Sequence, residues 1–187
     1  MTRIAIVDPQ PAVRAGLTLL LRAEPGLVPV GAATGAEDGF ELVDRLRPAV
    51  VLLEHHLLDG DGLTLCRRLK ALPHSPRVII YTSEMDALMA RVAGADGLVD
   101  KAAEPSELFE AVRVVARGGL ALPPLDREEL DAAAHLIDPE DLALLAMLVD
   151  GTSAGDVADT LHLDRRRVGR RIERLLGRLR RRTPAAA

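Results

Sequence analysis

The sequence predicts an α/β fold, a five-stranded doubly wound parallel sheet, followed by a second, small all-α helix-turn-helix domain. Apolar, β-branched runs alternate five times with segments of helical period up to residue 117. Gly118-Gly119 and Pro123-Pro124 then stop this alternation, and only segments of helical period follow. The 187 residues, 48% of them hydrophobic, suffice for one ordinary domain and a small one, so a disordered chain is excluded.

The strands are expected at residues 3–8, 27–32, 49–53, 77–82 and 97–99, where apolar residues run together as in buried parallel strands. The first helix is expected from Ala12 to the stop at Glu24-Pro25-Gly26, and the others at 36–46, 62–72, 84–93 and 105–117. Strands and helices in this order require right-handed crossovers, which place helices on both faces of the sheet.

The stop signals also predict the domain boundaries. We expect the sheet domain at residues 1–120, a linker helix within 121–137, the helix-turn-helix domain at 138–182, and a disordered tail at 183–187. Three helices of the second domain begin at residues that cap a first turn, namely Asp138, Ser153 and Asp164, with Pro139 at the first helical position. The tight turn at 161–163 between the last two predicts a helix-turn-helix.

Four polar residues stand at the carboxyl ends of expected strands. Asp8 ends the first strand, Glu54 follows the third, Thr82 ends the fourth, and Lys101 follows the fifth. Ligands of doubly wound sheets bind beyond the carboxyl ends of the strands. We therefore expect these four side chains to converge on one site.

The charge of the chain is divided unevenly. Residues 164–182 hold ten arginines against Asp164 and Glu173, a net charge of +8, so the remaining residues must carry −12 to give the net charge of −4. A basic helix on an otherwise acidic chain predicts contact with a polyanion. The candidate contacts to double-stranded DNA are Arg165, Arg166, Arg167, Arg170, Arg171 and Arg174, because arginine binds phosphates and guanine edges through two nitrogens.

Composition excludes several classes of protein. Cys66 is the only cysteine, so the chain has no intramolecular disulfide and lacks the ligands of a cysteine-based zinc site. The apolar run at the N-terminus is too short for a secretion signal, and no uncharged apolar stretch of about 18 residues occurs. The sequence contains no nucleophile–base pair and no phosphate-binding glycine loop, which are the motifs that would indicate an enzyme. We expect a cytoplasmic, non-enzymatic protein without a cofactor and without membrane contact.

Together these residues resemble a response regulator of the NarL/FixJ type, in which a flavodoxin-like receiver domain precedes a LuxR-type helix-turn-helix. In the receiver the resemblance rests on Val7-Asp8, Pro11 and Arg14, on VVLLEHHLLDGDGLTLCRRLK around Glu54, on Thr82, and on GADGLVDKAAEPSELFEAVRVVARGG around Lys101. In the second domain it rests on Asp138-Pro139-Glu140-Asp141, Gly151, Ser153, Val157-Ala158, Leu161, Val168 and Leu176. The resemblance implies DNA binding, and phosphotransfer from a histidine kinase to an aspartate after the third strand, with Mg²⁺ held by an acidic pair after the first.

This chain departs from the family pattern where phosphotransfer takes place. Glu54 stands at the acceptor position, and Pro9, which has no side-chain ligand, replaces the second acid of the Mg²⁺-binding pair. Leu98 stands where the family commonly has an aromatic switch residue, and Tyr81 is expected to point to the opposite face of the sheet. The expected receiver is therefore degenerate and independent of phosphorylation, and Glu54 is placed to reach Lys101 and Thr82 unaided.

The loop after the third strand also allows a metal-binding interpretation. His55, His56, Asp59 and Asp61 follow Glu54, and Asp59-Gly60-Asp61-Gly62 faintly resembles the start of a calcium loop. The further oxygen ligands of such a loop are missing. We therefore expect no metal here, but a solvated turn in which Asp61 caps the following helix.

The expected function is that of a DNA-binding transcriptional regulator with a degenerate receiver. The alternatives are a conventional phosphorelay regulator and a partner-sequestering protein that does not bind DNA; Glu54 with Pro9 disfavours the first, and the arginine-rich helix disfavours the second. A homodimer is expected, because one small helical domain offers too little surface for tight specific binding. The segments 84–93, 97–99 and 105–117 are the expected pairing surface, and a small molecule or partner protein is the expected regulator.

Overall fold

The computed structural model describes residues 1–84 and 86–181. The expected tail at 183–187 lies outside the described residues. The chain forms two compact units. Of the described residues, the first unit contains the chain up to Glu84 together with Ala95–Leu122, and the second contains Asp86–Gly94 and residues 123–181.

A five-stranded parallel sheet forms the centre of the first unit. Its strands are β1 (Thr2–Val7), β2 (Leu27–Ala33), β3 (Val50–Leu53), β6 (Arg77–Thr82) and β7 (Gly97–Asp100), in the order β2-β1-β3-β6-β7. The strand ends are in register, because Val7 pairs with Leu53 and Thr82 with Asp100. This is the flavodoxin-like order, in which the switch point lies between β1 and β3. The predicted fold class is confirmed.

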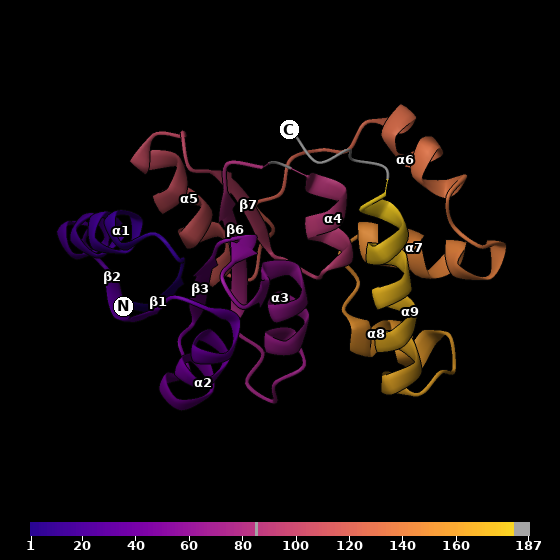
Figure 1. Cartoon of the computed structure of the whole chain (residues 1–187), viewed down its shortest axis with the longest axis horizontal. Helices are drawn as coiled ribbons and strands as arrows, with labels where there is room; N and C mark the ends of the chain where they lie inside the picture. Colours follow the sequence, from indigo (N-terminus) through magenta and orange to yellow (C-terminus); the bar gives the residue numbers. More distant parts are fainter. Residues whose placement is uncertain (85, 182–187) are drawn as a thin grey trace. The chain divides into compact units, whose positions relative to one another are not determined.

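Helices cover both faces of this sheet (Figure 1). On one face, α1 (Pro11–Ala23) and α5 (Pro105–Ala116) bury leucines and valines against Ile4, Ile6 and Leu52. On the other face lie α2 (Ala36–Leu46) and α3 (Gly62–Lys70). Parallel strands buried on both sides have no polar face, which explains why their sequences are continuously apolar rather than alternating.

A short hairpin that the sequence analysis did not anticipate follows β3. Its strands are β4 (His56–Leu57) and β5 (Gly60–Asp61), paired antiparallel. Gly62 starts α3 so close to the preceding loop that a Cβ atom there would lie 2.1 Å from the Glu54 carbonyl oxygen. Only glycine allows this approach, so Gly62 fixes the path of the chain around Glu54.

The second unit is helical. It contains α4 (Ala87–Val92), α6 (Arg127–Ala134), a 3-10 turn η1 (Pro139–Asp141), α7 (Leu142–Val149), α8 (Ala154–Thr160) and α9 (Arg165–Leu179). Among the described residues, no helix combines the length and the apolar character that a membrane crossing requires.

Two of the three expected helix caps of the helix-turn-helix are confirmed. The side chain of Ser153 accepts a hydrogen bond from the backbone N–H of Asp156 at 3.1 Å, and that of Asp164 accepts one from Arg167 at 2.8 Å. The expected cap at Asp138 is wrong: its carboxylate instead binds the guanidinium of Arg178, Oδ2 to Nη2 at 2.6 Å. A charged partner on α9 competes successfully for the carboxylate that a backbone N–H would otherwise bind.

Helix α4 packs against α7 and α9 inside the second unit. Its apolar side chains Leu88, Met89 and Val92 are buried. Arg91 adds hydrogen bonds from its guanidinium to the carbonyl oxygens of Val149 at 3.1 Å and Pro123 at 2.9 Å. The structure therefore groups α4 with the helices from the C-terminal third of the chain. The sequence analysis had instead assigned this segment to the sheet domain at residues 1–120.

A buried ion cluster closes the amino end of β6. Asp96 is 3% exposed, and its carboxylate binds the ammonium of Lys70 at 2.9 Å and the guanidinium of Arg77 at 2.7 Å. It also accepts a hydrogen bond from the backbone N–H of Val78 at 2.8 Å. Each carboxylate oxygen is therefore used, as burial of a charge requires.

Replacing this carboxylate should destabilise the first unit. Asp96→Ala leaves the Val78 N–H without its acceptor and two cations without their partner, so we expect a loss of about 2 to 4 kcal/mol in the free energy of unfolding. Urea denaturation of the full chain measures it. Asp44→Ala, at an exposed position of α2, is the control and should change stability by less than about 0.5 kcal/mol. Equal effects of the two variants would contradict a structural role for the cluster.

Candidate functional site

The four polar residues expected at the strand ends come together at the carboxyl edge of the sheet. Asp8 follows β1, Glu54 follows β3, Thr82 ends β6 and Lys101 follows β7. Backbone hydrogen bonds hold them in place: Glu54 N donates to the Val7 carbonyl oxygen at 2.8 Å, and Lys101 N donates to that of Thr82 at 3.0 Å.

Lys101 forms the centre of this site. Its Nζ lies 2.7 Å from Oδ2 of Asp8 and also forms an ion pair with Oε2 of Glu54. Asp8 and Glu54 are 2% and 6% exposed, and the side chain of Lys101 is 14% exposed. One ammonium therefore neutralises part of the charge of two buried carboxylates, as a buried charge requires.

The remaining oxygens of the two carboxylates bind the backbone. Oδ1 of Asp8 accepts a hydrogen bond from the Gln10 N–H at 2.7 Å, and Oε1 of Glu54 accepts one from the His56 N–H at 3.1 Å. All four carboxylate oxygens thus have a protein partner. The loops after β1 and β3 are held by the same two side chains that bind Lys101.

The environment keeps Glu54 and Lys101 charged at neutral pH. Burial by itself would raise the pKa of Glu54, but hydrogen bonds from Lys101, Thr82 and His56 lower it below the ordinary value of 4.5. Burial would likewise lower the pKa of Lys101, but the carboxylates of Asp8 and Glu54 raise it above 10.5. The site is therefore a fixed ion cluster rather than a proton-transfer pair.

These residues do not fit Mg²⁺, which the resemblance to response regulators implies for the ordinary members. Mg²⁺ requires near-octahedral oxygen coordination. Pro9 supplies no side-chain oxygen, and the oxygens of Asp8 and Glu54 already bind Lys101 and backbone N–H groups. A cation entering here would have to displace the ammonium of Lys101 from both carboxylates.

The switch residues are arranged as the sequence predicted. Tyr81 packs against the core cluster formed with α1 and α5, while Thr82 is buried and its hydroxyl helps to lower the pKa of Glu54. The Thr82 hydroxyl oxygen also accepts a hydrogen bond from the Glu84 N–H at 3.2 Å. Thr82 thus already stabilises the charge of the acidic group at the acceptor position.

The acidic residues of the β3–α3 loop serve as helix caps. Asp61 caps α3, since its Oδ2 accepts hydrogen bonds from the Thr64 N–H at 2.8 Å and hydroxyl at 2.7 Å, which confirms the prediction. Asp59 caps α2 from a distance, accepting hydrogen bonds from the N–H groups of Ala36 and Glu37. These bonds hold the pKa of Asp59 below its ordinary value. Asp59 thereby ties the loop after Glu54 to a helix that follows β2.

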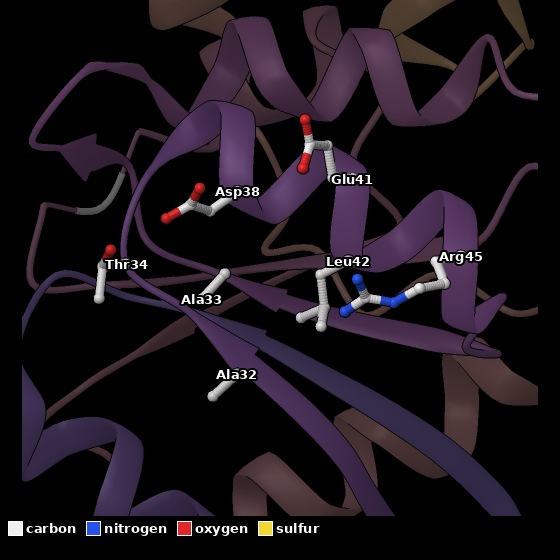
Figure 2. Close-up of a pocket in the computed structure, with 7 residues that line it drawn as sticks. All are labelled: Ala32, Ala33, Thr34, Asp38, Glu41, Leu42 and Arg45. Atoms are coloured by element: carbon white, nitrogen blue, oxygen red, sulfur yellow. The ribbon is translucent and has the colours of Figure 1, made fainter.

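A shallow cavity of about 300 Å³ lies at the edge of the sheet between the end of β2 and α2. Figure 2 shows Asp38 directed towards Thr34 and Arg45 directed along the helix towards Leu42. Its lining residues are Ala32, Ala33, Thr34, Asp38, Glu41, Leu42 and Arg45, and none of the four residues of the ion cluster is among them. A small molecule at the acceptor position is therefore not supported by this cavity.

The arginines of α9 divide into two groups. Arg165, Arg166, Arg167 and Arg170 are exposed, and among the described residues their side chains form no ion pair. They lie in the first two turns of α9, the second helix of the helix-turn-helix. Ser153 and Asp164 fix the starts of the two helices, so these turns have a defined direction.

Arg171 and Arg174 differ from the first group because they pair with acidic residues before α7. The side chain of Arg171 is 11% exposed, whereas that of Arg174 is 51% exposed. The guanidinium of Arg171 pairs with Asp141, which is 2% exposed, and also donates to the Glu140 carbonyl oxygen. Arg174 lies 3.5 Å from Asp141 and 3.7 Å from Glu140. For Arg171 the sequence held a signal: it lies three residues after Val168 and four before Leu175, beside the apolar stripe of α9.

The fold and the ion cluster define a class of protein. A parallel sheet in the order β2-β1-β3-β6-β7, with an acid after β1, an acid after β3, a threonine on β6 and a lysine after β7, is a receiver domain. The response regulator receiver domain family matches residues 4–113, and the chain belongs to this family.

Relatives extend this result over the whole chain. The DNA-binding transcriptional activator DevR/DosR of Mycobacterium tuberculosis is 35% identical over 201 residues, covering 100% of this chain and 93% of that protein. The nitrate/nitrite response regulator protein NarL of Escherichia coli is 26% identical over 187 residues, covering 92% and 87%. The structure of a LuxR-family two-component response regulator from Aurantimonas matches with a TM-score of 0.63 at 28% identity, covering 72% of this chain and 99% of that chain. The expected NarL-type family is confirmed, and these relatives are regulators rather than enzymes.

The ion cluster predicts how stability depends on pH. Because the pKa of Glu54 is lowered on folding, its charge contributes stability above the ordinary value of 4.5, and this contribution is lost as the pH falls through the folded-state pKa. Glu54→Gln should therefore be less stable than the parent at pH 7, and the difference should shrink below about pH 4.5. Thermal denaturation across this range measures it.

The exposed Glu41 provides the matched control. Glu41→Gln removes a carboxylate of the same size outside the cluster, and we expect its stability to follow the parent at each pH. A difference between Glu54→Gln and the parent that stays constant down to acid pH would contradict a charged Glu54 in the folded protein.

Proposed function

We propose that this protein is a DNA-binding transcriptional regulator whose receiver works without phosphorylation. The observation that carries the proposal is the position of Lys101, whose ammonium joins Asp8 and Glu54. In the family, by the resemblance described above, the lysine and the hydroxyl residue engage the phosphorylated aspartate. Here Lys101 already binds the carboxylate of Glu54, and Thr82 helps to lower its pKa, so one conformation of the switch is held by the protein's own side chains.

An ion cluster of this kind sets conformation more than stability. The desolvation of buried charges offsets much of their attraction, so the net gain in free energy is small. Its geometric demands remain, because Lys101 reaches both carboxylates only when the loops after β1, β3 and β7 are in this arrangement. We propose that this arrangement is the active-like one and that other signals, a ligand or a partner protein, supply any remaining control.

DNA binding is supported by the second unit and by the relatives. Four exposed arginines lie at the start of α9, whereas Arg171, Arg174 and Arg178 pair with residues 138–141. The relative from Mycobacterium tuberculosis is named as a DNA-binding transcriptional activator. Positive charge at a helix start, free of internal carboxylates, fits the phosphates and the major groove of duplex DNA.

We further propose that the protein pairs as a homodimer on DNA, since two half-sites bound together gain affinity from the linkage. Leu88, Met89 and Val92 of the expected pairing segment 84–93 are buried in the second unit. Leu98 and Val99 of the expected segment 97–99 are buried as well. Pairing through the receiver would therefore use the exposed residues of segment 105–117.

The first test is phosphorylation. Incubation with acetyl phosphate and Mg²⁺ should add no phosphoryl group to the parent protein, because the acceptor is a glutamate already bound to Lys101 and the Mg²⁺ ligands are incomplete. Intact-mass spectrometry reads the result. The double variant Glu54→Asp with Pro9→Asp restores both family residues and is the comparison that should gain mass. A phosphoryl group on the parent that disappears in Glu54→Ala would favour a conventional phosphorelay regulator instead.

The second test separates the two groups of arginines. Arg170→Ala removes an exposed cation, so DNA affinity should fall by about 1 to 3 kcal/mol and the salt dependence should lose about one unit of slope. Arg171→Ala leaves the buried Asp141 without its main partner, so it should lower the stability of the helical unit in urea. Titrations of duplex DNA fragments at several salt concentrations measure the affinity and salt dependence of Arg170→Ala. The same titrations give the stoichiometry, which should be two chains per palindromic site.

Arg22→Ala, at an exposed position of α1, is the control for loss of charge alone. It should leave DNA affinity and salt dependence unchanged. An equal loss in Arg22→Ala and Arg170→Ala would show that the net charge of the chain, rather than α9, governs the interaction.

A further inference from the structure

Two histidines and a glutamate gather beside the ion cluster, on the solvent side of Glu54. His55 and His56 come from the loop after β3, and Glu84 comes from the loop after β6. One ligand atom from each lies within 4.8 Å of the other two. The imidazole rings stack with their centroids 4.5 Å apart, and Nε2 of His56 lies 2.9 Å from Oε2 of Glu84.

The loop itself holds the two rings on one side. Successive residues of an extended strand point to opposite faces, but the chain bends at His55 and enters the β4–β5 hairpin. The carbonyl oxygen of His55 accepts a hydrogen bond from the Gly62 N–H at 2.7 Å, and the N–H of His56 is bound by Glu54. Both histidine backbones are therefore fixed, and only side-chain rotation is left.

The carboxylate of Asp61 contacts the imidazole ring of His55. Nε2 of His55 lies 3.4 Å from Oδ1 of Asp61, whose other oxygen caps α3. Histidines that bind metals commonly donate their second ring nitrogen to a carboxylate, which fixes the ring and its tautomer. With Nε2 directed to Asp61, the Nδ1 atom of His55 is the nitrogen left for a metal.

We propose that His55, His56 and Glu84 bind one divalent transition-metal ion of the zinc type. Imidazole nitrogens with a carboxylate oxygen are ligands that Zn²⁺ accepts, and water completes a tetrahedral set. Ligand atoms around Zn²⁺ lie about 3.3 Å apart at ordinary bond lengths. The side chains of His56 and Glu84 are more than half exposed, so they can rotate to close the remaining distance.

This site revises the expectation of no metal in the loop after Glu54. The sequence placed His55 and His56 beside Asp59 and Asp61, but the structure uses both aspartates as helix caps. Glu84 completes the group instead, and it is 28 residues from His56 in the sequence. The acidic group Asp138, Glu140 and Asp141 is a weaker candidate, because its carboxylates already bind arginines of α9.

The ion would join the same two loops that a phosphoryl group brings together in ordinary receivers. His56 donates its backbone N–H to Glu54, and Glu84 donates its own to the Thr82 hydroxyl. Drawing Glu84 towards His56 therefore acts directly on the partners of the ion cluster. This regulatory role rests on the proposed function, whereas metal binding by itself does not.

Zinc titration of the metal-free full chain, followed by calorimetry, tests the site. We expect one strongly bound ion per chain, and at least about tenfold weaker binding in His56→Ala and in Glu84→Gln. Both side chains are exposed, so these variants should fold as the parent does. Co²⁺ provides a second readout, because its visible absorption bands report a tetrahedral site and should be lost in the same variants.

His135→Ala is the matched control, since His135 is an exposed histidine of the helical unit. It should bind zinc as tightly as the parent. A parent affinity within about twofold of that of the His56→Ala and Glu84→Gln variants, or a loss of binding in His135→Ala instead, would overturn the site.

Titration of a duplex DNA pool with and without Zn²⁺ tests the regulatory role. We expect the DNA affinity of the parent to change by at least about threefold on zinc binding, and that of His56→Ala not to change. Zinc binding without any change in DNA affinity would overturn the regulatory role and leave the site intact. Absence of DNA binding in both states would instead contradict the proposed function, because metal binding is measured without DNA.

Discussion

The ammonium of Lys101 lies between two buried carboxylates, and the receiver edge is organised around this contact. Each carboxylate has two oxygens, and each gives one to Lys101 and one to a backbone N–H, of Gln10 or of His56. The cluster therefore connects side-chain charge directly to the paths of two loops. Neutral residues of similar size could fill the same volume, but they would not fix which loop conformation goes with which strand end.

The arginine-rich helix shows how one residue type serves two purposes within four turns. Arginines at the start of α9 have water around them, whereas Arg171 and Arg178 reach back to the acidic residues before α7. Asp141 is buried, and without Arg171 its charge would lie in an apolar domain of few residues. Some arginines of α9 therefore stabilise the helical domain through ion pairs. A domain this small cannot bury much apolar surface by itself.

Sequence periodicity predicted the elements that depend on local pattern. Helix α2 (Ala36–Leu46) has the predicted bounds, the strand ends bring Asp8, Glu54, Thr82 and Lys101 together, and the caps at Asp61, Ser153 and Asp164 form as expected.

The features that the sequence analysis missed depend on partners far apart in the chain. Asp138 binds Arg178 rather than its own helix, Arg171 turns inward, and Glu84 reaches His56. Such contacts follow from how elements pack. Helix period places Arg171 beside the apolar stripe of α9, but neither helix period nor capping rules identify the partner that any of these side chains binds.

The presence of both Pro9 and Glu54 has a consequence for how this site can change by mutation. A return to aspartate at position 54 alone would shorten the side chain that Lys101 and the His56 N–H now bind, without completing a metal site. A return to an acid at position 9 alone would place a third carboxylate near a cluster whose single ammonium is already shared. If the receiver works without phosphorylation as proposed, neither single change is favourable at this edge of the sheet. An aspartate acceptor and a second acid after β1 would then have to be introduced together to allow magnesium-dependent phosphotransfer.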